Sequence, residues 1–139
     1  MHILPTEIGK RQDILVYSDG TYVKVEVTSK TIDKWTWIKG IPDEGVHLLI
    51  FVDFTKKELC EKPNFYIMTA LEWRNMLPNL DGIKNNPKYA GVDPKDNHTP
   101  IWKDSRNKGI GIKVIDVEQQ LDKWEKLENL LNKRDESVK

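Results

Sequence analysis

Residues 13–30 read Asp13-Ile-Leu-Val-Tyr-Ser-Asp-Gly-Thr-Tyr-Val-Lys-Val-Glu-Val-Thr-Ser-Lys30, and this pattern predicts a β-hairpin. An apolar run comes first, an Asp-Gly pair then favours a tight turn, and the returning strand alternates apolar and polar residues. Successive side chains of a strand point to opposite faces. One face therefore carries Val23, Val25 and Val27, and the other carries Tyr22, Lys24, Glu26, Thr28 and Lys30.

Two carboxylates of this hairpin, Asp13 and Glu26, are candidate ligands of a divalent metal ion. Mg²⁺ prefers hard oxygen ligands and is held by one or two carboxylates together with waters. Such an ion polarises a phosphodiester and activates an attacking water, and a nearby lysine offsets the developing charge. Lys24 and Lys30 share the face of Glu26 and are the candidate catalytic lysines. An ordinary half-exposed strand fits the same alternation, and the residues leave that alternative open.

The composition predicts one cytoplasmic domain. A chain of 139 residues can bury a single core, and its net charge of zero argues against a strongly basic nucleic-acid coat. A lone cysteine, Cys60, fits a reducing compartment. We see no signal peptide, and the longest apolar run, residues 46–52, is far shorter than a membrane span. We therefore expect no membrane partner.

The rest of the chain predicts an α+β or mixed α/β domain that spans residues 1–139. Further strands are expected at 36–41, 46–52, 64–68 and 109–115. Thr69 and Glu72 have the spacing of a capping box, which predicts a helix ending near Pro78. A second helix should start at Asp116, with an apolar stripe formed by Val117, Leu121, Trp124, Leu127 and Leu131. The domain core is thus expected at 9–77 and 109–133, and the tail 134–139 should fray.

Residues 78–108 are rich in Pro, Asn, Asp, Gly and Lys and predict a long loop. Six basic residues make its second part locally basic: Lys84, Lys88, Lys95, Lys103, Arg106 and Lys108. Lys103, Arg106 and Lys108 are the candidate nucleic-acid contacts, because lysine and arginine neutralise phosphates. Asp93, Asp96 and Asp104 dilute this charge, so a merely solvated loop is an equal alternative.

The tryptophans also allow two interpretations. Trp73 and Trp124 lie on expected helices, where burial in the core is favoured over stacking on bases. Trp35 and Trp37 have lysines nearby and are better candidates for an aromatic, basic surface. Core burial or a subunit contact is still preferred for them.

Five short segments together resemble one known family. They are Asp13-Ile-Leu-Val16, Val23-Lys-Val-Glu-Val-Thr-Ser29, Leu49-Ile-Phe-Val-Asp-Phe54, Phe65-Tyr-Ile-Met-Thr69 and Asp122-Lys-Trp-Glu-Lys-Leu127. The chain resembles the PD-(D/E)XK nuclease-like superfamily, and within it small bacterial members, over residues 9–77 and, loosely, 100–131. The resemblance implies a restriction-endonuclease-like core, with a central mixed β-sheet flanked by helices. It also implies Mg²⁺ on Asp13 and Glu26, and DNA as substrate.

The sequence departs from the family pattern in two places. Thr28 occupies the position where the family has its lysine, two residues after Glu26. The usual N-terminal helix does not fit in residues 1–12, because Pro5 and Gly9 interrupt it. One hypothesis is a metal-dependent nuclease in which Lys24 or Lys30 replaces the missing lysine. A second is a non-catalytic member that binds protein or nucleic acid, as a homo-oligomer or with a partner subunit. An unrelated α+β domain that binds a small molecule is a third.

Overall fold

The structure, a computed structural model, describes residues 2–8, 11–18, 20–38, 48–58, 60–80, 82–93, 95, 99–103 and 109–138. Side chains are described throughout these ranges except at residues 2–8, 11–13, 21, 36–37 and 133–138.

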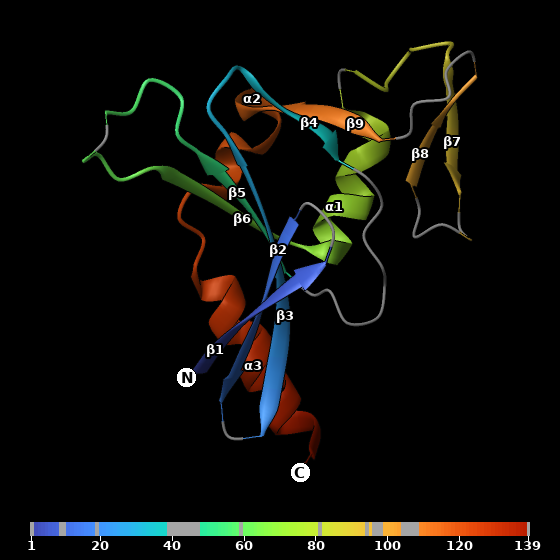
Figure 1. The fold of residues 1–139 in the computed structure, drawn as a ribbon. Helices are drawn as coiled ribbons and strands as arrows, with labels where there is room; N and C mark the ends of the chain where they lie inside the picture. The colour runs from blue at the N-terminus through green and yellow to red at the C-terminus, as the bar shows by residue number, and fades with distance from the viewer. Residues whose placement is uncertain are drawn as a thin grey trace.

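A five-stranded mixed sheet with the order β1-β2-β3-β5-β6 forms the centre of the fold (Figure 1). Its strands are β1 (His2–Ile8), β2 (Arg11–Ser18), β3 (Thr21–Lys30), β5 (Leu48–Asp53) and β6 (Asn64–Thr69). The first three form an antiparallel meander, β5 runs parallel to β3, and β6 returns antiparallel to β5. The expected α+β class with a mixed sheet is confirmed.

Helices and two small sheets complete the fold. The small sheets pair β4 (Lys34–Ile38) with β9 (Ile110–Lys113), and β7 (Tyr89–Asp93) with β8 (Thr99–Trp102). The helices are α1 (Ala70–Met76), α2 (Val114–Val117) and α3 (Glu125–Val138), with 3-10 turns at Leu77–Asn79 and Glu118–Gln120. The predicted capping box at the start of α1 is confirmed, since Thr69 and Glu72 bond each other's backbone N–H groups. Among the described helices, none combines the length and the apolar character that a membrane crossing requires.

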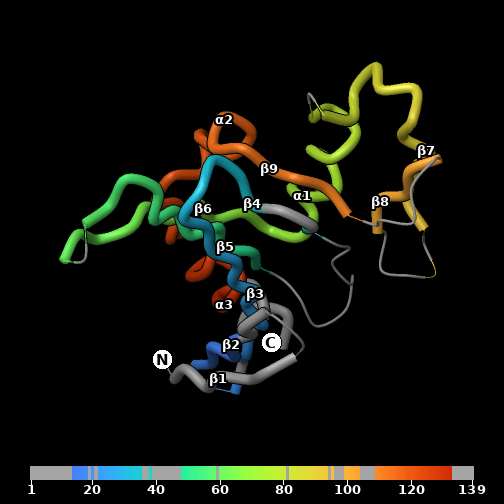
Figure 2. Tube along the Cα trace, turned by 45° about the horizontal axis from the view of Figure 1, so that its top comes forward, coloured from blue at the N-terminus to red at the C-terminus, as the bar shows by residue number. Residues whose placement is uncertain are grey.

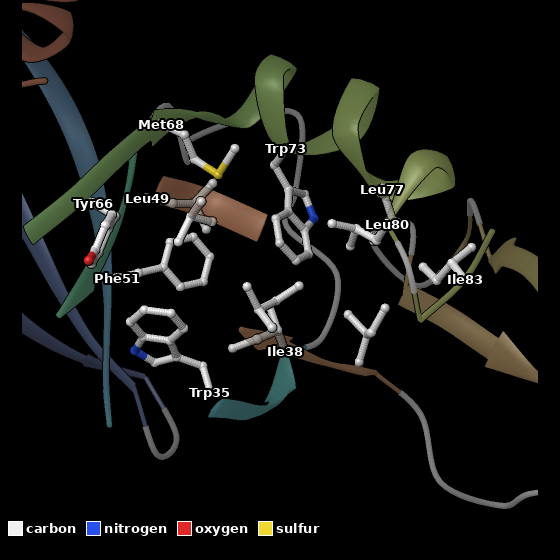
Figure 3. Packing of buried hydrophobic residues seen from close by; sticks show 13 residues of the cluster. Trp35, Ile38, Leu49, Phe51, Tyr66, Met68, Trp73, Leu77, Leu80 and Ile83 are labelled. Atoms are coloured by element: carbon white, nitrogen blue, oxygen red, sulfur yellow. The ribbon is translucent and has the colours of Figure 1, made fainter. Parts of the chain in front are cut away.

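Each face of the sheet contributes to a separate hydrophobic core. On one face the valines of β3 pack with leucines of α3, including Leu127 and Leu131. The other face packs against α1 and the β4–β9 pair, as Figure 3 shows. That larger cluster contains Trp35, Ile38, Leu49, Phe51, Tyr66, Met68, Trp73, Leu77, Leu80, Ile83, Ile110, Ile112 and Val117. The preferred burial of Trp35 and Trp73 is confirmed, whereas the Trp37 side chain lies outside the described part of the chain.

The prediction of a single helix from Asp116 onward is wrong. The chain instead forms α2, a 3-10 turn, an extended junction and then α3. At the junction Leu121 forms a β-bridge with Tyr66, and Asp122 adopts a positive φ of 53°. Its N–H donates to the carbonyl of Phe65 at 2.8 Å. Because the junction pairs with the edge strand β6, its backbone cannot continue the helical hydrogen bonds.

The predicted burial of Trp124 is also wrong, because of the same break in the helix. This side chain is 40% exposed and packs against Phe65 with the rings tilted by 58° and their centroids 5.4 Å apart. A continuous helix would have carried it on the apolar stripe beside Leu127. It instead precedes α3, so it covers the edge of the sheet rather than filling the core.

Two other stretches have more structure than expected. Residues 2–8 form β1, which pairs along its whole length with β2. The expected loop 78–108 contains the β7–β8 hairpin, which lies beyond α1 from the five-stranded sheet in both views (Figures 1 and 2). Short strands with turn residues between them carry a weak periodic signal, and for that reason the composition suggested a loop.

Candidate functional site

The register of β2 and β3 places Asp13 directly opposite Glu26. Residues opposite each other in an antiparallel pair share one face of the sheet, with Cβ atoms about 4.5–5.5 Å apart. The Asp13 side chain is outside the described atoms, but the backbone fixes its row. The two carboxylate-bearing residues of the predicted metal site are therefore cross-strand neighbours.

Glu26 lies where the hydrophobic core of its face ends. Along the same row, Glu26 pairs with Leu49 of β5, and Leu49 pairs with Met68 of β6. Leu49 and Met68 are buried in the core beneath α1, whereas Glu26 is half-buried and its Oε2 atom is shielded from solvent. A carboxylate at the border of an apolar region is in an environment where a bound cation would be strongly attracted.

The donor chemistry of this row fits a hard divalent ion. Asp13 and Glu26 both carry carboxylates, the hard oxygen donors that Mg²⁺ prefers beside waters. Among the described side chains, no cluster of three or more His, Cys, Asp or Glu residues could hold a metal.

Lys24 lies next to the carboxylate row. It is half-buried, pairs with Leu15 of β2, and by strand alternation shares the face of Glu26 two residues away. On the other side of Glu26, Thr28 is also half-buried and pairs with Phe51 of β5. Thr28 is therefore bounded by the hydrophobic core.

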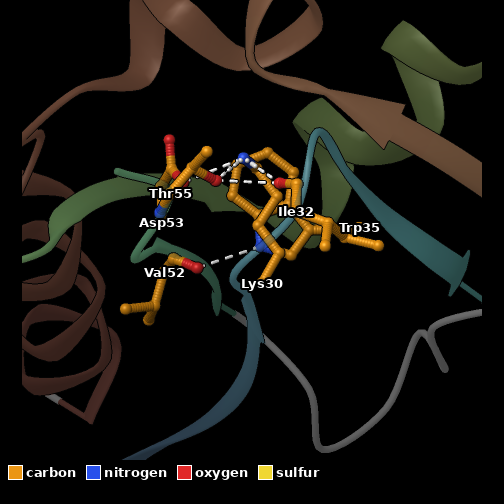
Figure 4. Close-up of polar contacts among 6 residues, drawn as sticks. All are labelled: Lys30, Ile32, Trp35, Val52, Asp53 and Thr55. Atoms are coloured by element: carbon orange, nitrogen blue, oxygen red, sulfur yellow. Dashed lines mark hydrogen bonds and ion pairs between the residues drawn. The ribbon is translucent and has the colours of Figure 1, made fainter. Parts of the chain in front are cut away.

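Lys30 is buried in a polar network at the end of β3 (Figure 4). Its Nζ donates to Ile32 O at 2.9 Å, to Asp53 Oδ1 at 2.8 Å and to Thr55 Oγ1 at 2.7 Å. An ammonium has three N–H donors, so these bonds use its full capacity. The ammonium also lies 4.8 Å from the centroid of the Trp35 ring. Lys30 is thus committed to this network, four residues along β3 from Glu26.

Asp53 forms the acidic half of that network. Its Oδ1 also accepts the backbone N–H of Thr55 at 2.9 Å. Burial alone raises the pKa of this carboxyl, but hydrogen bonds from Lys30 and Thr55 outweigh burial and hold the pKa below its ordinary value. The network closes the turn between β3 and β4 onto the end of β5. Sequence reasoning missed it, although an aspartate ending an apolar strand is a signal for a buried partner.

The candidate nucleic-acid residues are only partly described. Lys103 is exposed and follows β8 directly, with its N–H donating to Lys88 O at 2.8 Å. Arg106 and Lys108 lie outside the described residues. The structure therefore places Lys103 on the β7–β8 hairpin and brings Asp13 to Glu26, while Lys30 lies elsewhere.

Comparison of the chain with protein-family models, with curated proteins and with solved structures gives no match.

Proposed function

We propose that this protein is a PD-(D/E)XK-type nuclease domain that uses a divalent metal ion to act on DNA. The observation that carries the proposal is the direct cross-strand pairing of Asp13 with Glu26. The antiparallel meander β1–β3, continued by the parallel strand β5, further supports a restriction-endonuclease-like core. The resemblance of the five short segments to the family is the remaining support for the proposal, since no family model, curated protein or solved structure matches the chain.

The chemistry divides between the ion and the chain. A bound Mg²⁺ supplies polarisation of the phosphodiester and a lower pKa for the attacking water. Asp13 and Glu26 hold the ion in one row of the sheet. Lys24 stands in for the missing lysine, because its ammonium can offset negative charge that develops on the phosphate. Thr28 carries no charge, so we expect slow cleavage.

Two observations favour a second candidate, a non-catalytic member of the fold that binds nucleic acid or protein, alone or as a homo-oligomer. Thr28 replaces the lysine of the family pattern, and Lys30 is fully engaged with Asp53 and its neighbours. In this alternative the Asp13–Glu26 row remains from an active ancestor. Metal binding and cleavage distinguish the two candidates.

The test is cleavage of plasmid and single-stranded DNA in Mg²⁺ or Mn²⁺. We expect slow, metal-dependent cleavage by the wild type and none by Glu26→Ala. Glu128→Ala is the matched control, since Glu128 is exposed on α3. Undiminished cleavage in Glu26→Ala contradicts the site. No cleavage and no metal binding by folded wild type supports the binding module instead.

A further inference from the structure

Four of the seven large hydrophobic side chains that are exposed in the described part of the chain gather at one end of the molecule. They are Ile32 in the turn between β3 and β4, Phe54 directly after β5, Ile115 on α2 and Leu121 in the junction before α3. Figures 1 and 2 both show the β3–β4 turn, α2 and the β5–β6 hairpin at this end. A group of exposed apolar side chains marks an interaction surface, whereas scattered ones are ordinary.

Hydrogen bonds hold the segments that carry these side chains in place. The N–H of Phe54 donates to Lys30 O at 2.9 Å, and Thr55 Oγ1 donates to Ile32 O at 2.8 Å. The turn is thus fastened to the start of the β5–β6 hairpin. Leu121 is held at the edge of β6 by its β-bridge. A surface that is ordered in advance loses little conformational entropy when a partner binds.

The two isoleucines extend from the same end of the β4–β9 pair. Lys34 lies directly opposite Lys113, with Ile32 two residues before Lys34 and Ile115 two residues after Lys113. Ile32 is 59% exposed and Ile115 is 65% exposed. Val117, by contrast, is buried in the core. The short helix α2 therefore packs through Val117 and leaves Ile115 in solvent.

Exposed charges of opposite sign lie on the two sides of this apolar surface. On the β4–β9 side they are Asp33, Lys34 and Lys113, and on the β6 side they are Glu118, Asp122 and Lys123. Positive charge is thus in excess on the first side and negative charge on the second. Asp116, between the two sides, is half-buried and accepts the backbone N–H of Lys113, and the β5–β6 hairpin adds charges of both signs.

We propose that this end of the molecule is the interface of a homodimer, with the two copies related by a two-fold axis. Such an axis places the same surface of each copy against the other. The basic side of one copy then faces the acidic side of its partner, twice, around a centre of apolar side chains. A partner of uniform charge matches only one of the two sides. The net charge of zero also leaves no overall repulsion between copies.

Sedimentation velocity over a range of protein concentrations measures the association. The wild type should form a dimer whose fraction rises with concentration. Ile115→Glu places a carboxylate from each copy in the apolar centre, and it should raise the dissociation constant about tenfold or more. Leu71→Glu is the matched control, because Leu71 is 68% exposed on another helix, α1. This control should dimerise like the wild type.

An exchange of charge tests the two-fold arrangement. Lys113→Glu leaves negative charge in excess on both sides of the surface, and Glu118→Lys leaves positive charge in excess on both. Each variant alone should dimerise about tenfold more weakly than the wild type, because like charges then face each other. An equimolar mixture of the two variants should recover the wild-type affinity, since each acidic side then meets a basic side.

Three results overturn the inference. They are a monomeric wild type at every concentration, equal weakening by Ile115→Glu and Leu71→Glu, and a mixture of the two charge variants that associates no better than either variant alone. The inference does not rest on the proposed function, because dimerisation needs neither the metal ion nor Glu26. The dimer therefore stands or fails separately from DNA cleavage.

Discussion

Thr28 lies between two charged residues on one face of β3, with Glu26 on one side and Lys30 on the other. The ammonium of Lys30 donates hydrogen bonds to Asp53, Thr55 and the carbonyl of Ile32, so it is fully engaged at the end of β3. The carboxylate row therefore lacks an ammonium on the Thr28 side. In the proposed nuclease, this one side chain would limit the rate of cleavage.

A lysine at position 28 should increase metal-dependent cleavage. Residues two apart on a strand share a face and are separated by about 6.6 Å, so the ammonium of Thr28→Lys can approach the Glu26 row. Electrostatic stabilisation of a developing charge is worth about a hundredfold or more, and we expect a gain of at least about tenfold in rate. Ser29→Lys is the control, because Ser29 is exposed on the opposite face. Equal rates in the two variants would contradict this role.

The buried pair of Lys30 and Asp53 should make the protein sensitive to acid. The pKa of Asp53 is lowered in the folded state, because hydrogen bonds from Lys30 and Thr55 outweigh the opposing effect of burial. The folded state therefore binds this proton less readily than the unfolded state. The pair's contribution is fully present above the ordinary aspartate pKa of about 3.9 and is lost as pH falls through the lowered value.

Urea unfolding between neutral pH and pH 2 measures this contribution. The free energy of unfolding of the wild type should fall more steeply below about pH 4 than that of Asp53→Asn, which lacks the titrating group. Parallel curves for the two proteins would show that Asp53 does not couple folding to pH. Asp53→Asn should also be less stable at neutral pH, since it leaves the Lys30 charge buried without its counter-ion.

Besides the backbone contacts of Leu121 and Asp122, the side chain of Lys126 holds the junction between α2 and α3 in place. Lys126 Nζ donates to Ile67 O at 3.1 Å and to Glu72 Oε2 at 3.0 Å, and it also bonds Gln120 Oε1. It thus joins α3 to β6 and to the capping box of α1. Burial alone raises the pKa of Glu72, but bonds from Thr69 and Lys126 lower it overall.

Replacing Lys126 by methionine should remove these hydrogen bonds between the elements and lower the free energy of unfolding. Loss of charged hydrogen bonds around a partly buried group costs about 1–3 kcal/mol of unfolding free energy. Lys123 is exposed in the same junction, so Lys123→Met should stay within about 0.5 kcal/mol of the wild type. Chemical denaturation of the two variants measures the difference. A loss of the same size in both would mean that the Lys126 contacts contribute nothing specific.

Local sequence patterns predicted the elements that are determined by interactions between residues near each other in the chain. Valine alternation predicted β3, and the Thr69–Glu72 spacing predicted the start of α1. The pairing of Asp13 with Glu26 follows from the two-residue turn, since Ser18 opposite Thr21 fixes every later pair. The partner of Lys30 depends on the register of β3 with the distant strand β5, and the break before α3 depends on the bridge from Leu121 to Tyr66. The position of Asp53 at the end of an apolar strand signals a buried partner without identifying Lys30, and the bridge to Tyr66 leaves no local signal.

In the molecule as a whole, the carboxylate row lies beside the hydrophobic cores rather than within them. Two hydrophobic cores hold the sheet between α3 on one face and α1 with β4–β9 on the other. The carboxylate row lies on the second face, beside the core, on strands β2 and β3. The β7–β8 hairpin lies beyond α1 from the five-stranded sheet (Figures 1 and 2). The carboxylate row and the hairpin thus belong to different parts of the fold.

Calorimetric titration with Mn²⁺ tests most directly whether Asp13 and Glu26 share a divalent ion. We expect a single Mn²⁺ site in the wild type and in the control Glu128→Gln, and its loss in Glu26→Gln and in Asp13→Asn. These variants remove a charge while keeping nearly the same shape, so circular dichroism should show an intact fold. Absence of Mn²⁺ binding by the folded wild type, or wild-type binding by Glu26→Gln, would contradict the account.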